Sequence, residues 1–179
     1  DALKIVKLAF PKLKTIGIIH SDDENGIAHV EEAKKVAPSF GMTVISKEIN
    51  KNDKITDSLN ELKAKGVEAF AVPLDTYYGI RNYEACHELE KFSLQTKIPV
   101  FSFALMKVPG AVLYVGSDFG EIGTLAGQEA AKILKGEARP ESLPILKQED
   151  LKILVDTHML KALNFQLPME ILQIAQAVE

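Results

Sequence analysis

The chain has 179 residues, of which 46% are hydrophobic and 26% are charged, and its formal net charge is −4 at pH 7. This composition excludes a disordered chain, a collagen-like repeat and a coiled-coil rod. Without a basic excess, the chain has no electrostatic basis for binding nucleic acid or an anionic membrane. Its length fits one domain, or one domain with part of another.

Apolar runs typical of strands alternate with apolar residues at helical spacing through the first two thirds of the chain. The strands read as nearly continuous apolar runs, which is expected when both faces of a sheet are covered. Because the connections are short, we expect parallel strands with right-handed crossovers. The predicted segments are an amphipathic piece over 3–10, strands over 15–20, 42–45, 69–72, 98–103 and 111–115, and helices over 27–40, 55–66 and up to about 96.

The pattern changes after the last of these strands. Gly116-Ser117-Asp118-Phe119 predicts the cap of a helix that runs to Leu134. Small residues along this helix permit a close approach to another backbone. The remaining predicted segments are a linker over 136–144, a strand over 151–155 and two short helices around 160 and 171.

The sequence gives little support for a site that depends on cysteine, on a metal ion or on a nucleophile. Cys86 is the single cysteine, which excludes an internal disulfide and a cysteine-based zinc or iron–sulfur site. The four histidines follow no metal-binding spacing, and no phosphate-binding, dinucleotide-binding or hydrolase motif follows a predicted strand. We therefore expect no cofactor, no metal and no enzymatic activity. No apolar run approaches the ~20 residues of a membrane helix.

Candidate ligand residues lie in three loops at the carboxyl ends of predicted strands. Ligands of open parallel sheets bind at this edge. The loops span 21–26, 75–79 and 102–106. They contain the candidate ligand-binding residues Ser21, Asn25, Gly26, Asp75, Thr76, Tyr77 and Phe103.

The side chains in these loops suit different parts of a small polar solute. Ser21 and Asn25 offer donors beside the free N–H groups of a helix start, which suits a carboxylate. Asp75 only accepts hydrogen bonds and suits an ammonium, and Tyr77 and Phe103 offer flat apolar surface. A structural alternative stays open for each: helix caps for the first two, a turn residue for Asp75 and packing for the tyrosine.

A phosphoacceptor receiver domain is a less favoured alternative. Asp22-Asp23, Asp75 and Ser102 follow successive strands, as the acidic pair, the phosphoacceptor and the hydroxyl of such a domain do. A receiver domain also needs a lysine at the end of a fifth strand. The predicted strand over 111–115 ends in Gly116-Ser117 instead.

A series of segments matches one known family in order and spacing. They are Lys14–Ile19, Pro73–Thr76 (against the family's Pro-Thr-Asp-Asn), Lys97–Phe101, Gly110-Ala111, Gly116–Gly123, Ala130–Glu137, Leu151–Asp156 and the stretch 162–168. Over nearly the whole chain, the sequence resembles the substrate-binding proteins of ABC transporters, which have the type I periplasmic-binding fold. It departs from the family at Asp22, Asp23 and Gly26, where Ser or Asn is frequent, and at Thr76, where Asn is frequent.

The resemblance implies an α/β three-layer sandwich with a mainly parallel sheet, which is one lobe of such a protein. Complete members have two lobes joined by three crossovers, with the ligand between them, and the resemblance implies that most of the first lobe lies outside this chain. The implied division is 1–13 at the hinge or end of the first lobe, 14–114 and 145–179 in the second lobe, and 115–144 returning to the first.

The implied function is that of the solute-binding component of an ABC uptake transporter, which binds a small solute such as an amino acid without chemistry. Asp75 is then expected at the ammonium, Ser21 and Asn25 at the carboxylate, and Tyr77 or Phe103 at the side chain. The implied partners are the solute and a membrane permease. The implied location is periplasmic or extracellular, as a lipoprotein in full-length form. A ligand-sensing domain of a signalling protein with the same fold is the alternative.

The helix over 119–134 would pack on the first lobe in complete members. We expect it here to pack against its own lobe or against a second copy of the chain, which would give a homodimer, because an exposed apolar stripe favours association.

Overall fold

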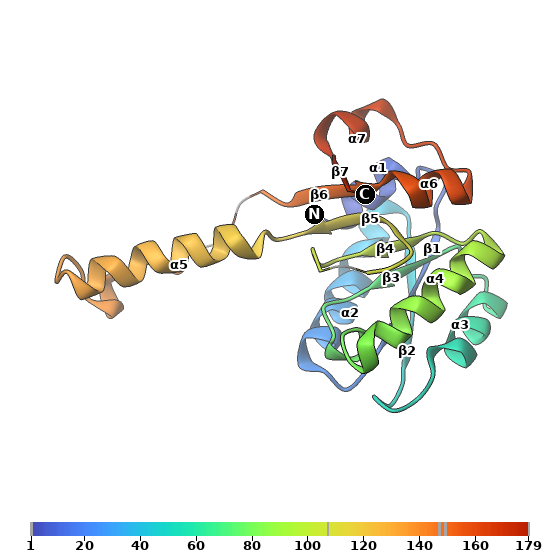
Figure 1. Ribbon diagram of the computed structural model, residues 1–179, viewed down its shortest axis with the longest axis horizontal. Coiled ribbons are helices and arrows are strands. Elements are labelled where there is room, and N and C mark those ends of the chain that lie inside the picture. Colours follow the sequence, from blue (N-terminus) through green and yellow to red (C-terminus); the bar gives the residue numbers. More distant parts are fainter. Residues whose placement is uncertain (1, 107, 147, 149, 179) are drawn as a thin grey trace.

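The computed structural model describes residues 2–106, 108–146, 148 and 150–178, and it consists of a layered lobe with a helical arm that projects from it (Figure 1). Within these residues, seven strands form one sheet in the order β2-β1-β3-β4-β5-β6-β7. The strands are β1 (Thr15–His20), β2 (Thr43–Glu48), β3 (Ala69–Val72), β4 (Val100–Ser102), β5 (Ala111–Gly116), β6 (Lys152–Asp156) and β7 (Gln176–Val178).

The helices alternate with the strands for most of the chain. The α-helices are α1 (Ala2–Ala9), α2 (Glu24–Val36), α3 (Ile55–Ala64), α4 (Glu84–Thr96), α5 (Phe119–Leu134), α6 (Thr157–Leu163) and α7 (Met169–Ile174), and the 3-10 turns are η1 (Ala37–Phe40), η2 (Thr76–Tyr78), η3 (Arg81–Tyr83) and η4 (Pro140–Ser142). Strands β1 to β5 run parallel, as predicted, whereas β6 is antiparallel to β5 and parallel to β7.

Helices cover both faces of the sheet, which makes the lobe a three-layer α/β sandwich as expected. Strand β3 shows how the sequence serves both faces. Ala69 and Ala71 join one buried cluster with α1 and α2, whereas Phe70 and Val72 join another with α3 and α4. Successive side chains of a strand point to opposite faces, so a strand buried on both sides reads as an unbroken apolar run.

The ends of the second helix differ slightly from the predicted 27–40. The α-helix stops at Val36, and η1 continues it to Phe40. Pro38 accounts for the change, because proline has no N–H for the α-helical bond and its ring crowds the preceding turn. Gly41 then takes a φ of 64°, which is the left-handed conformation expected of a helix stop.

The N-terminal helix α1 is part of the lobe's core. Leu3, Val6 and Ala9 are buried in the same cluster as β1 and α2, and α1 contacts β5 and α7. Residues 2–13, which the resemblance assigns to the hinge or the end of the first lobe, thus pack within this sandwich.

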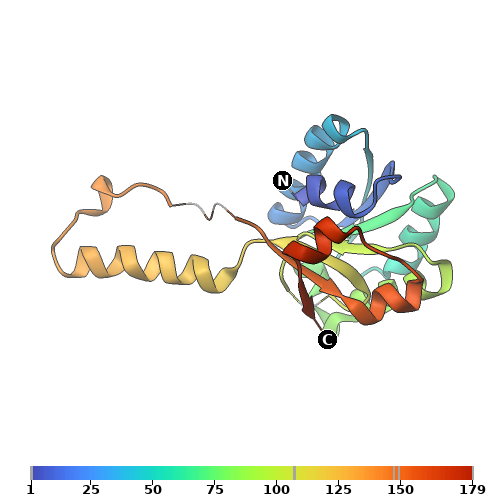
Figure 2. The ribbon, with the colours of Figure 1, turned by 90° about the horizontal axis from the view of Figure 1, so that it is seen from above.

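The arm is formed by α5 and the chain that returns beside it, and both views show it extending away from the sheet (Figures 1 and 2). The helix begins as predicted, with Asp118 accepting hydrogen bonds from the N–H groups of Gly120 and Glu121. No described residue of α5 is buried, and Phe119 is 55% exposed. The helix therefore does not pack against its own lobe, which was one of the two expected arrangements. Among the described residues, no helix combines the length and hydropathy needed to cross a bilayer.

Replacing Gly123 or Gly127 with alanine should stabilise the arm. A Cβ added at either glycine meets no atom within 4 Å, and an exposed Gly→Ala change inside a helix gains about 0.5–1 kcal/mol. Amide hydrogen exchange along α5 should slow in both variants, with exchange in α3 serving as the control. Faster exchange in α5 would mean that this face of the helix is covered in solution.

Candidate functional site

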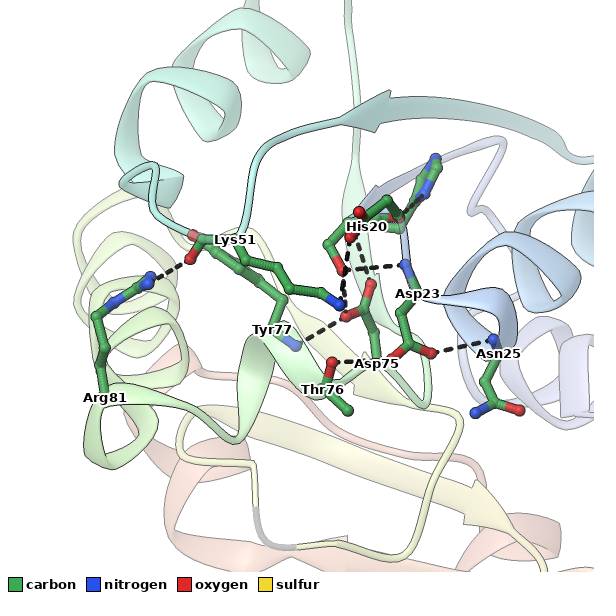
Figure 3. A network of polar contacts seen from close by, with 10 residues as sticks. His20, Asp23, Asn25, Lys51, Asp75, Thr76, Tyr77 and Arg81 are labelled. Carbon is green, nitrogen blue, oxygen red and sulfur yellow. Dashed lines mark hydrogen bonds and ion pairs between the residues drawn. The ribbon is translucent and has the colours of Figure 1, made fainter.

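The carboxyl edge of the sheet is organised around Asp75, which follows β3. One carboxylate oxygen accepts the backbone N–H of Ser21, at 2.6 Å. The other accepts the Ser21 hydroxyl and the N–H of Tyr77, both at 2.8 Å (Figure 3). Asp75 is 3% exposed and Ser21 is fully buried. These charge-assisted bonds tie the end of β1 to the end of β3, and we call Ser21, Asp75 and the Tyr77 amide the carboxylate clamp.

The first turn of α2 closes against the same carboxylate. Gly26 is buried, and a Cβ built on it would lie 2.5 Å from an oxygen of Asp75. Real Cβ atoms do not approach so closely, so the backbone can reach Asp75 only because residue 26 is glycine. The departure from the family at this position therefore has a steric reason in this chain.

An exposed rim lies above the clamp and joins the same two loops. Asp23 accepts the N–H of Asn25, which caps α2, and the hydroxyl of Thr76 at 2.8 Å. The hydrogen bond from Thr76 is the main cause that lowers the pKa of Asp23 below its usual range. The Asn25 side chain is exposed beside this pair (Figure 3). The rim thus presents an amide, a hydroxyl and a carboxylate to solvent.

The two tyrosines after Asp75 are packing residues in this structure. Tyr77 and Tyr78 are almost completely buried, and their rings meet edge to face with centroids 5.4 Å apart. The Tyr77 hydroxyl donates to the carbonyl of Asp53 and the Tyr78 hydroxyl to that of Ile19. Burial raises the pKa of Tyr77 to about 12. Of the predicted aromatic contacts, Phe103 alone remains half-exposed.

His29 joins the site although the sequence analysis did not select it. Its Nδ1 accepts the N–H of Leu74, at 3.2 Å, and so ties α2 to the loop that carries Asp75. Desolvation of the half-buried ring lowers the pKa of His29. His29 follows Asn25 by four residues on the same helix, and this spacing was the signal that could have found it.

The candidate residues are therefore gathered in three tiers. Ser21, Gly26 and Asp75 form the buried clamp, Asn25 and Thr76 lie on the rim, and Tyr77 packs below. Phe103 directly follows β4, and its N–H donates to the carbonyl of Val72.

The described residues offer no support for metal or thiol chemistry at this edge. Within them, no group of three or more His, Cys, Asp and Glu side chains is arranged to hold a metal ion. Burial raises the pKa of Cys86 to about 12, so its thiol stays protonated. The Ser102 hydroxyl donates to the carbonyl of Ala104. Because internal donors occupy both oxygens of Asp75, the geometry does not favour the receiver alternative.

The model of the protein family described as ABC transporter substrate binding protein matches residues 1–179 of the chain. The chain belongs to this family. It is 26% identical over 166 residues to a tyrosine-binding protein of Clostridioides difficile, a match that covers 92% of this chain and 46% of that protein. The chain thus spans about half the length of this curated relative.

Two solved structures have the same fold. One is the ABC domain from Streptococcus pneumoniae in complex with L-Trp, with a TM-score of 0.80, 24% identity, and coverage of 98% of this chain and 60% of that one. The other is the ligand-free, open form of a substrate binding protein with adhesive properties from Clostridium difficile, with a TM-score of 0.77 and 26% identity. That match covers 99% of this chain and 58% of the solved one.

Asp75→Asn should destabilise the lobe by about 2–3 kcal/mol, because at least one buried N–H loses its acceptor. Urea unfolding would measure the difference, and Asp150→Asn, at an exposed position, is the matched control. Equal stability of the two variants would contradict the clamp.

The stability of the lobe should depend on pH through His29. Because its pKa is lowered on folding, the unfolded chain takes up a proton at a higher pH than the folded chain does. The contribution of His29 to the free energy of unfolding is then fully present above about pH 6.5. It is lost as the pH drops through the pKa of His29 in the folded state. His29→Asn keeps an acceptor for Leu74 without titrating, so its curve from pH 7.5 to 5 should be flatter. Parallel curves for variant and parent would rule this out.

Proposed function

We propose that the lobe forms one side of a site for a small solute, an amino acid, at the edge where β1, β3 and β4 end. The observation that carries this proposal is the convergence of the loops after β1 and β3 on the Asp75 clamp at the carboxyl edge of a parallel sheet, which is where such sheets bind ligands. Family membership supports a binding role rather than a catalytic one.

In this proposal the rim binds the solute and the clamp positions the loops. The exposed Asn25 side-chain amide donates to the carboxylate of the solute, and the hydrogen bond from Thr76 to Asp23 holds the loop after β3 beside it. Ser21 and Asp75 fix the loops that present these groups. Asp75 is 3% exposed and both of its oxygens accept internal hydrogen bonds, so in this proposal it positions the loops rather than contacting the solute's ammonium, which is the role expected for it from the sequence. Phe103, rather than the buried Tyr77, supplies the apolar contact.

The solute is then captured between this lobe and a second one, without chemistry, for delivery to the permease of an ABC uptake transporter. In this proposal residues 14–114 and 145–179 form the ligand-binding lobe, and 115–144 return to the other lobe. The protein acts outside the cytoplasmic membrane, as a lipoprotein in its full-length form. The 26% identity to a tyrosine-binding protein supports an amino acid as the solute.

Binding can be followed directly because the chain contains no tryptophan. Titration of L-tryptophan by its own fluorescence, and of other amino acids by calorimetry, should show weak binding, since one lobe supplies only part of the contacts. Asn25→Ala combined with Thr76→Val should weaken it by about tenfold, which corresponds to the loss of one to two hydrogen bonds.

Gln173→Ala, at an exposed position of α7, is the control and should bind as the parent does. An affinity that is the same in the rim variant and the control would reject this site. A failure of every amino acid to shift the NMR signals of the rim would reject the solute class.

A further inference from the structure

We propose that a groove beside the rim, between α1, α2 and the ends of β4 and β5, receives the apolar side chain of the bound solute, and that His29 selects among such side chains. This inference rests on the proposed function and extends it from the polar end of the solute to its side chain. The groove has a volume of about 260 Å³. It is lined mainly by Leu3, His29, Ala33, Val36, Phe103 and Val115.

The groove and the rim share one face of α2. Asn25, His29 and Val36 follow one another at spacings of four and seven residues, so their side chains lie along a single stripe of the helix. Asn25 is on the exposed rim, and His29 and Val36 line the groove. A solute whose carboxylate is held at the start of α2 therefore has its side chain directed along this stripe.

The walls of the groove suit an uncharged, apolar group. Apart from His29, Glu32 and Ser117, the groove is lined by aliphatic side chains, Gly116 and the Phe103 ring. Glu32 is the charged residue among the groove-lining residues, and its side chain is 67% exposed. A negative charge there disfavours a solute with an acidic side chain.

His29 places a ring N–H donor in this largely apolar groove. Because Nδ1 accepts the Leu74 N–H, the neutral ring carries its proton on Nε2, at the opposite edge of the ring. Within the described part of the chain, no residue accepts a hydrogen bond from Nε2. The donor is thus available to a ligand, and an aromatic side chain with a hydroxyl offers an acceptor that a plain hydrocarbon ring lacks.

The test uses p-cresol and toluene, two rings that differ by one hydroxyl, together with L-tyrosine and glycine. NMR titration of the chain should show p-cresol shifting the amides of Ala33, Phe103 and Ser117. Val36→Phe fills the groove and should weaken p-cresol and L-tyrosine at least tenfold, while glycine binding changes less than twofold. Leu172→Phe, at an exposed position of α7, should change neither.

A second variant isolates the donor. His29→Asn keeps an acceptor for Leu74 and loses Nε2–H, so it should weaken p-cresol by about fivefold and leave toluene unchanged. Intermolecular nuclear Overhauser contacts between p-cresol and the Ala33 methyl, measured in the unaltered chain, locate the ligand even if Val36→Phe does not fold. Absence of those contacts, or equal affinity of Val36→Phe and Leu172→Phe, would overturn the inference.

The two proposals fail in different ways. Amino acids that shift the rim but bind Val36→Phe and His29→Asn as tightly as the parent would overturn the groove and leave the proposed function standing. If p-cresol occupied the groove while no amino acid bound the chain, the groove would stand as an apolar ligand site and the amino-acid proposal would fall.

Discussion

A buried carboxylate just after β3 organises the part of the carboxyl edge where β1 and β3 end. Burying a charge is costly unless it is fully hydrogen-bonded, and Asp75 meets this condition with three donors from two loops. The donors that satisfy Asp75 are the groups that fix the end of β1 and the start of η2. Loops are otherwise the least constrained parts of a sheet protein, so this one interaction supplies the rigidity on which a binding edge depends.

The sheet shows what local sequence can and cannot predict. Strands β1, β3 and β5 are buried on both faces, and their sequences are therefore apolar runs. The ends of these strands were predicted to within about one residue. Strand β7 left no such trace, because its three residues are largely exposed and owe their conformation to pairing with β6. The antiparallel direction of β6 is set by the return of the chain from α5, which no periodicity in β6 records.

The site shows the same limit at the level of side chains. The sequence indicated the right loops, because strand ends can be located from apolar runs. It did not reveal that Ser21 and Asp75, 54 residues apart, satisfy each other, or that Tyr77 turns inward to donate to Asp53. Polar residues at a strand end have the same pattern whether they face a ligand or one another. Only their three-dimensional partners separate a buried clamp from an exposed rim.

The contact between Gly26 and Asp75 links two positions that lie far apart in the chain. Any side chain at position 26 would occupy the space that the carboxylate fills, so the helix start and the loop after β3 are not free to change independently. The family's Pro-Thr-Asp-Asn loop keeps the acid where Ser or Asn is frequent at the first position, so a descendant that gained a side chain there would have to move the helix start away from the carboxylate. Divergence of ligand preference within this lineage would then combine a side-chain replacement with a small shift of the backbone at the mouth of the site.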